Sequence, residues 1–243
     1  MAGDKVYPSF EAAVADIPDG ATIMVGGFGG TAGIPQNLIV ALRNQGARDL
    51  TIIHNTAGFG LSGIGYAAPK GVRYNDHAIL IANKQVTKVI AAYPFPPYPT
   101  QTSPVKEQYQ AGEIELEIVP QGTLAERIRA GGSGIGAFYT RTGVGTSVER
   151  DKEKRVIDGE DYILEQALKA DFALIRAHQA DTTGNLVYRG TARTFNPVMA
   201  TAATITIVEV DDIVEVGALD PEHIITPFVY VDRIVKTAKG EGN

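Results

Sequence analysis

The sequence predicts an α/β fold, a single open and mostly parallel sheet with helices on both faces and a late antiparallel β portion. The first observation is a succession of buried strand (residues 21–25), glycine-rich crossing, helix (35–42) and second strand (50–54). Such a βαβ unit closes right-handed onto a parallel sheet. The second is that similar strand and helix patterns follow along the chain. The third is that 44% of the 243 residues are hydrophobic and no Pro/Gly/Ser-rich linker divides them, so one domain over residues 1–243 is expected.

The other elements follow from local patterns. Apolar residues of segment 10–17 fall on one helical stripe after Ser9, a favourable N-cap residue. Helix 35–42 should begin with Pro35 as its first residue, where a missing N–H costs nothing. Further helices are expected at 104–111 and 124–130, and further strands at 86–93, 115–119, 162–164, 172–177, 186–189 and 205–210. The turn at 181–184 should join two of these strands as a hairpin, and apolar residues of 224–235 should close the core.

Composition excludes several classes of function. The net charge of -6 disfavours a nucleic-acid partner, and the basic residues from Lys152 to Arg155 alternate with acids as on a solvated face. The absence of cysteine excludes a thiolate nucleophile, a disulfide and a sulfur metal site. The four histidines are scattered without metal-ligand spacing, so no metal is expected. No signal peptide or long apolar run is recognised, and we expect a cytoplasmic protein without a membrane partner.

The crossing after the first strand is a candidate ligand loop. Its glycines can take positive φ and let another molecule approach the backbone, and free N–H groups at the following helix start favour an anionic ligand. Gly27, Gly29 and Ala32 satisfy G-x-G-x-x-G/A. A dinucleotide site would also need an acid after the second strand, where the sequence has His54 and Asn55. A P-loop is excluded because no Lys-Ser/Thr pair follows the glycines.

Polar residues also follow the strands, where open α/β sheets bind ligands. Asn55 ends one strand and Gln121 follows another, and both can orient a substrate carboxyl or thioester through hydrogen bonds. Turn and capping roles are the alternative. The glycine-rich segment 130–145 should lie against a ligand or against backbone. The proline-rich segment 94–104 is expected to be a stiff specificity or interface loop.

Several motifs are spread over nearly the whole chain: DG at 19–20, IMVGGF at 23–28, GIP at 33–35, HNTAG at 54–58, PQGTLAERIRAGGSGIGAFYTRTGVGT at 120–146, DFALIRAHQAD at 171–181 and LDPEHIITP at 219–227. Together they resemble a known family, the family I CoA-transferases, and most of all the A subunits of 3-oxoacid and 3-oxoadipate CoA-transferases.

This resemblance implies the fold of that family and a heteromeric enzyme, expected as an α2β2 assembly with a B subunit. CoA would pass from succinyl-CoA to a 3-oxo acid through a glutamyl-CoA thioester on the B subunit, since this chain has no Ser-Glu-Asn-Gly motif. CoA and acyl-CoA would be substrates, with no permanently bound cofactor. The resemblance implies supporting roles for Asn55 and Gln121 and a CoA-binding loop made of Gly26, Gly27, Phe28, Gly29, Gly30, Thr31, Ala32 and Gly33.

Three departures from the family pattern concern the acid substrate. The glycine loop has one additional residue between Phe28 and Gly33, Thr56 stands where close relatives have a second asparagine, and segment 94–104 differs. The alternatives are an acyl-CoA hydrolase, a CoA-transferase of other acid specificity, and a non-catalytic nucleotide or sugar-phosphate sensor on the same scaffold.

Overall fold

The main sheet of the molecule is open and mostly parallel, as predicted. The computed structural model describes residues 5–29, 33–58, 75–96 and 102–238. The sheet has the order β11-β10-β8-β1-β2-β3-β4, in which neighbours run parallel, and β9 pairs antiparallel with β8. Its strands are β1 (Thr22–Val25), β2 (Leu50–Thr56), β3 (Val86–Tyr93), β4 (Glu115–Ile118), β8 (Ala170–Asp181), β9 (Leu186–Val187), β10 (Ala203–Val214) and β11 (Arg233–Lys236).

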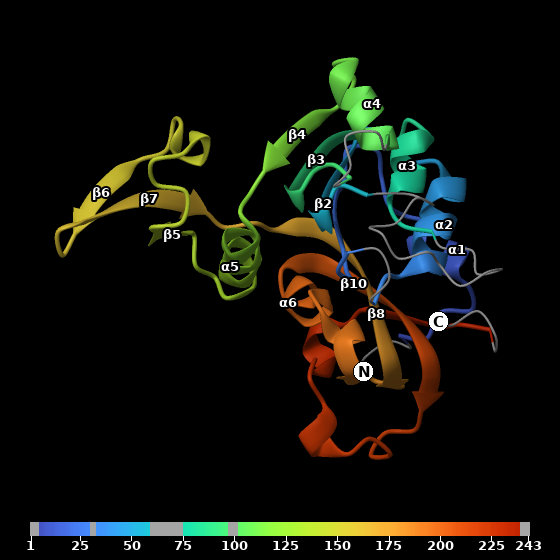
Figure 1. Cartoon of the computed structure of the whole chain (residues 1–243). Coiled ribbons are helices and arrows are strands. Elements are labelled where there is room, and N and C mark those ends of the chain that lie inside the picture. The colour runs from blue at the N-terminus through green and yellow to red at the C-terminus, as the bar shows by residue number, and fades with distance from the viewer. Residues whose placement is uncertain (1–4, 30–32, 59–74, 97–101, 239–243) are drawn as a thin grey trace.

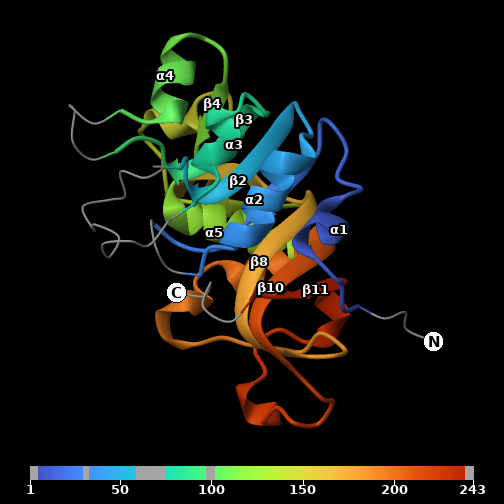
Figure 2. The same cartoon turned by 90° about the vertical axis from the view of Figure 1, so that its right-hand side faces the viewer.

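Helices cover both faces of this sheet (Figure 1). One face carries α1 (Phe10–Val14), α2 (Gln36–Gln45), α3 (Ala78–Ala82) and α4 (Pro104–Gln110), and the other carries α5 (Gln121–Gly132) and α6 (Asn196–Ala200). Successive strand residues point to opposite faces, so Ile52 packs into the core under α1 to α4 and Ile53 into the core under α5 and α6. Figure 2 looks onto α1, α2 and α3 with the sheet behind them.

Strand β1 lies at the point where the order of the sheet reverses. From β1 the chain builds β2, β3 and β4 outward on one side, and then returns to place β8, β10 and β11 on the other. In open α/β sheets a crevice opens at such a switch point, beyond the carboxyl ends of the strands. The glycine loop leaves β1 at this position.

A second, three-stranded antiparallel sheet projects beyond α5 (Figure 1). It contains β5 (Ala137–Thr140), β6 (Lys154–Ile157) and β7 (Glu160–Gln166), of which the sequence predicted only residues 162–164. The glycine-rich segment 130–145 ends α5 and enters β5. Of the two roles expected for it, the contact with backbone is the one observed at Gly131, where a Cβ would lie 1.9 Å from the Leu168 carbonyl oxygen. Of the predicted solvated face from Lys152 to Arg155, residues 153–155 are exposed, whereas Lys152 is half-buried and pairs with the buried Glu165 at 2.5 Å.

Local capping explains where several elements begin. The Ser9 side chain accepts from the backbone N–H of Ala12, which confirms the predicted N-cap of α1. The predicted hairpin between β8 and β9 is also present, and its turn is held by Asp181 Oδ1, which accepts from the backbone N–H groups of Thr183, Gly184 and Asn185. Pro35 is the N-cap residue of α2 and not its first helical residue as predicted, so the helix begins one residue later, at Gln36.

Segment 224–235 closes the core only in part. Val231, Ile234 and Val235 are buried, but Phe228 and Val229 are exposed, because only the end of the segment joins the sheet as β11. The prediction of one domain over the whole chain stays a prediction. Within the described ranges, no helix has the length and apolar character needed to cross a lipid bilayer.

Replacing Gly131 by Ala should lower the free energy of unfolding by about 2 kcal/mol, because the new Cβ would overlap the Leu168 carbonyl. The matched control is Gly122→Ala in the same helix, where no atom lies within 4 Å of the added Cβ. Urea denaturation of both variants measures the difference. Equal stability of the two would contradict the packing argument.

Candidate active site

A cavity of about 220 Å³ opens at the carboxyl ends of the parallel strands. The described residues that line it are Phe28, Gly29, Asn55, Thr56, Ala92, Tyr93 and Gln121. They follow or end β1, β2, β3 and β4, and the register pairs Thr56 with Tyr93 across β2 and β3. Parallel strands that end at one edge therefore bring together side chains that are far apart in the sequence.

The structure brings Phe28, Gly29, Asn55 and Gln121 together, four of the residues that the sequence analysis singled out. Gly26, Gly27 and Gly33 belong to the same loop but are not among the described lining residues. Gly30, Thr31 and Ala32 lie outside the described residues, as do the additional position of the loop and residues 97–101 of the proline-rich segment.

Two buried polar residues, Asn55 and Thr56, line this cavity. Asn55 is 2% exposed, and its Nδ2 atom has no hydrogen-bond partner among the described residues. Burying an amide without a hydrogen bond is costly, so this donor is suited to an oxygen of a bound molecule. Asn55 lies within β2 and Gln121 begins α5, whose start has no side-chain cap. Turn and capping roles therefore do not account for these two residues.

The glycines of the loop serve different purposes. Gly29 has a φ of 60°, and no atom of the described residues lies within 4 Å of an added Cβ, so within that part of the chain this side of its backbone is open. At Gly26 a Cβ would lie 1.8 Å from Asn196 Oδ1, and at Gly33 it would lie 2.2 Å from the Ala192 carbonyl oxygen. At Gly26 and Gly33 the chain itself fills the space that a side chain would take, so packing within the fold requires glycine at both positions.

The N-terminus of α2 is not free for an anionic ligand. Glu209 of β10 is fully buried, and its Oε2 accepts from the backbone N–H groups of Asn37 (2.9 Å) and Leu38 (3.2 Å). Its other oxygen pairs with the Arg176 guanidinium of β8. Burial raises the pKa of Glu209 to about 7, and Arg176 and the two N–H groups oppose this shift. The carboxylate of the chain itself thus takes the place predicted for a ligand at this helix start.

Two buried histidines support the end of β2. The rings of His54 and His77 lie 4.4 Å apart between centroids, and His77 Nε2 lies 3.0 Å from the Thr56 carbonyl oxygen. His54 Nδ1 lies 3.0 Å from both the backbone nitrogen and the carbonyl oxygen of Thr56. Burial, reinforced by the charge that His77 would carry, lowers the pKa of His54 to about 3. Burial lowers the pKa of His77 to about 4, so both rings are neutral at pH 7.

No metal ligands gather here, since the described part of the chain contains no group of three His, Asp or Glu side chains placed to hold an ion.

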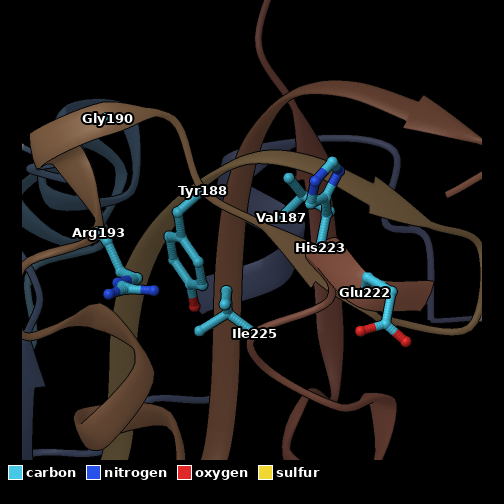
Figure 3. A pocket seen from close by; sticks show the side chains of 7 residues that line it. All are labelled: Val187, Tyr188, Gly190, Arg193, Glu222, His223 and Ile225. Carbon is cyan, nitrogen blue, oxygen red and sulfur yellow. The ribbon is translucent and has the colours of Figure 1, made fainter. Parts of the chain in front are cut away.

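A larger cavity of about 410 Å³ lies elsewhere, between the segment after β9 and the segment around His223 (Figure 3). Its charged residues, Arg193, Glu222 and His223, are exposed. The smaller cavity is the better candidate because it holds a buried, unpartnered donor at the edge where α/β sheets bind ligands.

Comparison with known proteins places the chain in a family. A family model described as "Coenzyme A transferase" matches residues 7–237. The chain is 53% identical over 232 residues to the A subunit of the 3-oxoadipate CoA-transferase of Pseudomonas putida, covering 96% of this chain and 93% of the relative. It is 49% identical over 241 residues to the A subunit of the succinyl-CoA:3-ketoacid coenzyme A transferase of Xanthomonas campestris pv. campestris (strain B100), covering 99% and 92%.

Among solved structures, the acyl-CoA transferase YdiF of Escherichia coli O157:H7 shares the fold with a TM-score of 0.80 and 23% identity. The match covers 98% of this chain, which spans about half (48%) of the YdiF chain. The chain therefore belongs to the coenzyme A transferase family of enzymes.

Sequence reasoning missed Asn196, Glu209 and Arg176. Glu209 did carry a signal, since it is the one acid in the apolar, β-branched segment 205–210, where an ionisable side chain needs a partner. Asn196 carried none, because it lies in a five-residue helix that shows no periodicity.

The histidine pair predicts a pH dependence of stability. Because both folded-state pKa values lie below 6.5, the unfolded chain binds protons that the folded chain does not, and stability is lost as pH falls from about 6.5 towards 4. Glu209 opposes this trend, since its raised pKa favours the folded state on acidification.

The variant His77→Gln isolates the effect of one ring. Between pH 6 and 5 it should lose about 1 kcal/mol per pH unit less stability than the wild type. His223→Gln is the control, since that side chain is 72% exposed, and should follow the wild type. Urea denaturation at each pH measures the slopes. A His77→Gln slope equal to that of the wild type would show that burial does not hold this ring neutral.

Proposed function

We propose that the chain is the A subunit of a CoA-transferase that moves CoA from succinyl-CoA to a 3-oxo acid, either 3-oxoadipate or an acid resembling acetoacetate. The observation that carries the proposal is the 53% identity to the A subunit of a 3-oxoadipate CoA-transferase over nearly the whole of both chains. The Asn55 donor, which has no partner among the described residues and lies in a cavity at the strand ends, supports the proposal because it can bind an oxygen of the substrate.

The composition of the cavity favours a nucleophile from another chain. Among its described lining residues there is no carboxylate and no other acid. A B subunit would therefore supply a glutamate, in an assembly that we expect to be α2β2 and cytoplasmic. Its carboxylate attacks the thioester carbonyl of the acyl-CoA and releases CoA thiolate, leaving a mixed anhydride. The thiolate then attacks the glutamyl carbonyl, which forms the enzyme thioester and frees the first acid. The second acid reverses both steps.

This chain would bind and orient the reacting groups. Asn55 Nδ2 and the Gln121 amide would donate to oxygens that become negative in the tetrahedral intermediates, a contribution of about 3 kcal/mol per donor in other enzymes. Phe28 and Tyr93 are both partly exposed beside them and would provide apolar walls for the acyl-CoA. Gly29 leaves the backbone open, and Gly30, Thr31 and Ala32 stay predicted members of the same wall.

Reconstitution tests the function. The purified chain mixed with the B subunit should convert succinyl-CoA and 3-oxoadipate or acetoacetate to the 3-oxoacyl-CoA, whereas neither chain alone should do so. After incubation of the pair with succinyl-CoA alone, the mass of the B subunit should rise by that of CoA minus water. Full-rate transfer by this chain alone would contradict the proposal. Rapid hydrolysis of succinyl-CoA to succinate and free CoA, without transfer to the second acid, would favour the hydrolase instead.

Substitution of the donors tests the site. Asn55→Ala should lower kcat of the reconstituted enzyme about 100-fold, because a buried oxyanion donor is lost, and Gln121→Ala should act in the same direction. The control is Asn44→Ala, an exposed asparagine of α2 far from the strand ends, which should leave kcat unchanged. Steady-state kinetics at saturating substrate measure the effect. An Asn55→Ala enzyme with wild-type kcat would remove this residue from the proposed mechanism.

A further inference from the structure

Asn196 connects both ends of the glycine loop to the sheet. It is the first residue of α6, and its side chain is fully buried. Its Oδ1 accepts from the backbone N–H of Arg176 in β8 (3.0 Å), and its Nδ2 donates to the carbonyl oxygens of Gly33 and Ala192 (both 3.0 Å). One amide group thus reaches from β8 to the far end of the loop.

The near end of the loop lies against the same amide. A Cβ at Gly26 would meet Asn196 Oδ1 at 1.8 Å, and a Cβ at Gly33 would meet Asn196 Nδ2 at 2.7 Å. Gly33 also has a φ of 66°, which a side chain would strain. Both glycines are therefore needed so that Asn196 can lie between the two ends of the loop.

The backbone is strained at Thr194, two residues before Asn196. Thr194 has a φ of 41°, a value that β-branched residues rarely adopt, and its hydroxyl lies 3.2 Å from Asn196 Nδ2. Phe195 stacks on Phe28 of the loop, with ring centroids 6.3 Å apart and an interplanar angle of 16°. Phe28 in turn lines the cavity.

We propose that Asn196 is a positioning residue for substrate binding, which holds the glycine loop closed on β8 so that Phe28 and Gly29 form one wall of the acyl-CoA site. None of its hydrogen-bond partners among the described residues is a lining residue of the cavity. This inference rests on the proposed function for the identity of the substrate, but the geometry of the loop can be tested without it.

Kinetics of the reconstituted pair provide the first test. Asn196→Ala removes the whole amide, and Asn196→Asp keeps the acceptor for Arg176 but loses the donor to Gly33. Both should raise KM for succinyl-CoA about tenfold, the effect of losing roughly 1.4 kcal/mol of binding, with kcat changed much less. A merely structural role would lower the thermal midpoint without moving KM of the folded enzyme.

The matched control is Gln85→Ala. Gln85 is also a buried amide that donates to two backbone carbonyls, those of Leu42 and Ala47. It lies just before β3, at the amino ends of the parallel strands, whereas the cavity lies at their carboxyl ends. Its loss should lower stability and leave KM unchanged. If Gln85→Ala raises KM as much as Asn196→Ala does, the effect is general loosening of the fold and the proposal is overturned.

Fluorescence of the chain alone provides the second test. The sequence contains no tryptophan, so Phe28→Trp introduces a single reporter on the loop. Adding Asn196→Ala to this variant should shift the emission to the red as the ring leaves Phe195, and adding Gln85→Ala should not. An unchanged emission together with an unchanged KM would overturn the proposal. If the wild-type pair transfers no CoA, the proposed function fails, and the emission alone decides the role of Asn196.

Discussion

The buried Glu209 carboxylate joins the two halves of the sheet. It belongs to β10, pairs with Arg176 of β8, and accepts from the first turn of α2, the helix that leads from β1 to β2. Strands β8 and β10 lie on one side of the switch point and β2 on the other. A carboxylate at a helix N-terminus is stabilised by the helix dipole and by the N–H groups it satisfies. The glycine loop immediately before α2 therefore ends on a helix whose first turn is hydrogen-bonded to Glu209 of β10, the residue that pairs with Arg176 of β8.

Much of the fold could be predicted from local patterns. The bounds of β3 agree with the expected strand at 86–93, and Ser9 and the turn after Asp181 act as predicted. The contacts that shape the site could not be found in this way. Glu209 meets the start of α2 across 172 positions of sequence, and Asn196 meets Gly33 across 163. Contacts between residues so far apart leave no periodic pattern in the sequence. Helices α3 and α6, with five residues each, are too short to show the periodicity of a helix.

The candidate site is also only partly predictable, for a physical reason. Asn55 and Gln121 could be placed at the strand ends, because parallel strands bring their carboxyl ends to one edge. The support at the end of β2 was missed, since it needs His77, which lies 21 positions after Thr56 in the sequence. The rings of His54 and His77 contact the backbone of Thr56, the residue next to Asn55, and Asn55 itself has an unused buried donor.

The glycine loop illustrates how one motif can combine two different constraints. Gly26 and Gly33 are needed because Asn196 and Ala192 occupy the space of their side chains, which is a requirement of the fold. At Gly29 an added Cβ would meet no atom of the described residues within 4 Å, so packing does not require glycine there, whereas the positive φ favours it. The two constraints thus fall on different residues of one loop: its ends pack against Asn196 and Ala192, and Phe28 and Gly29 line the cavity.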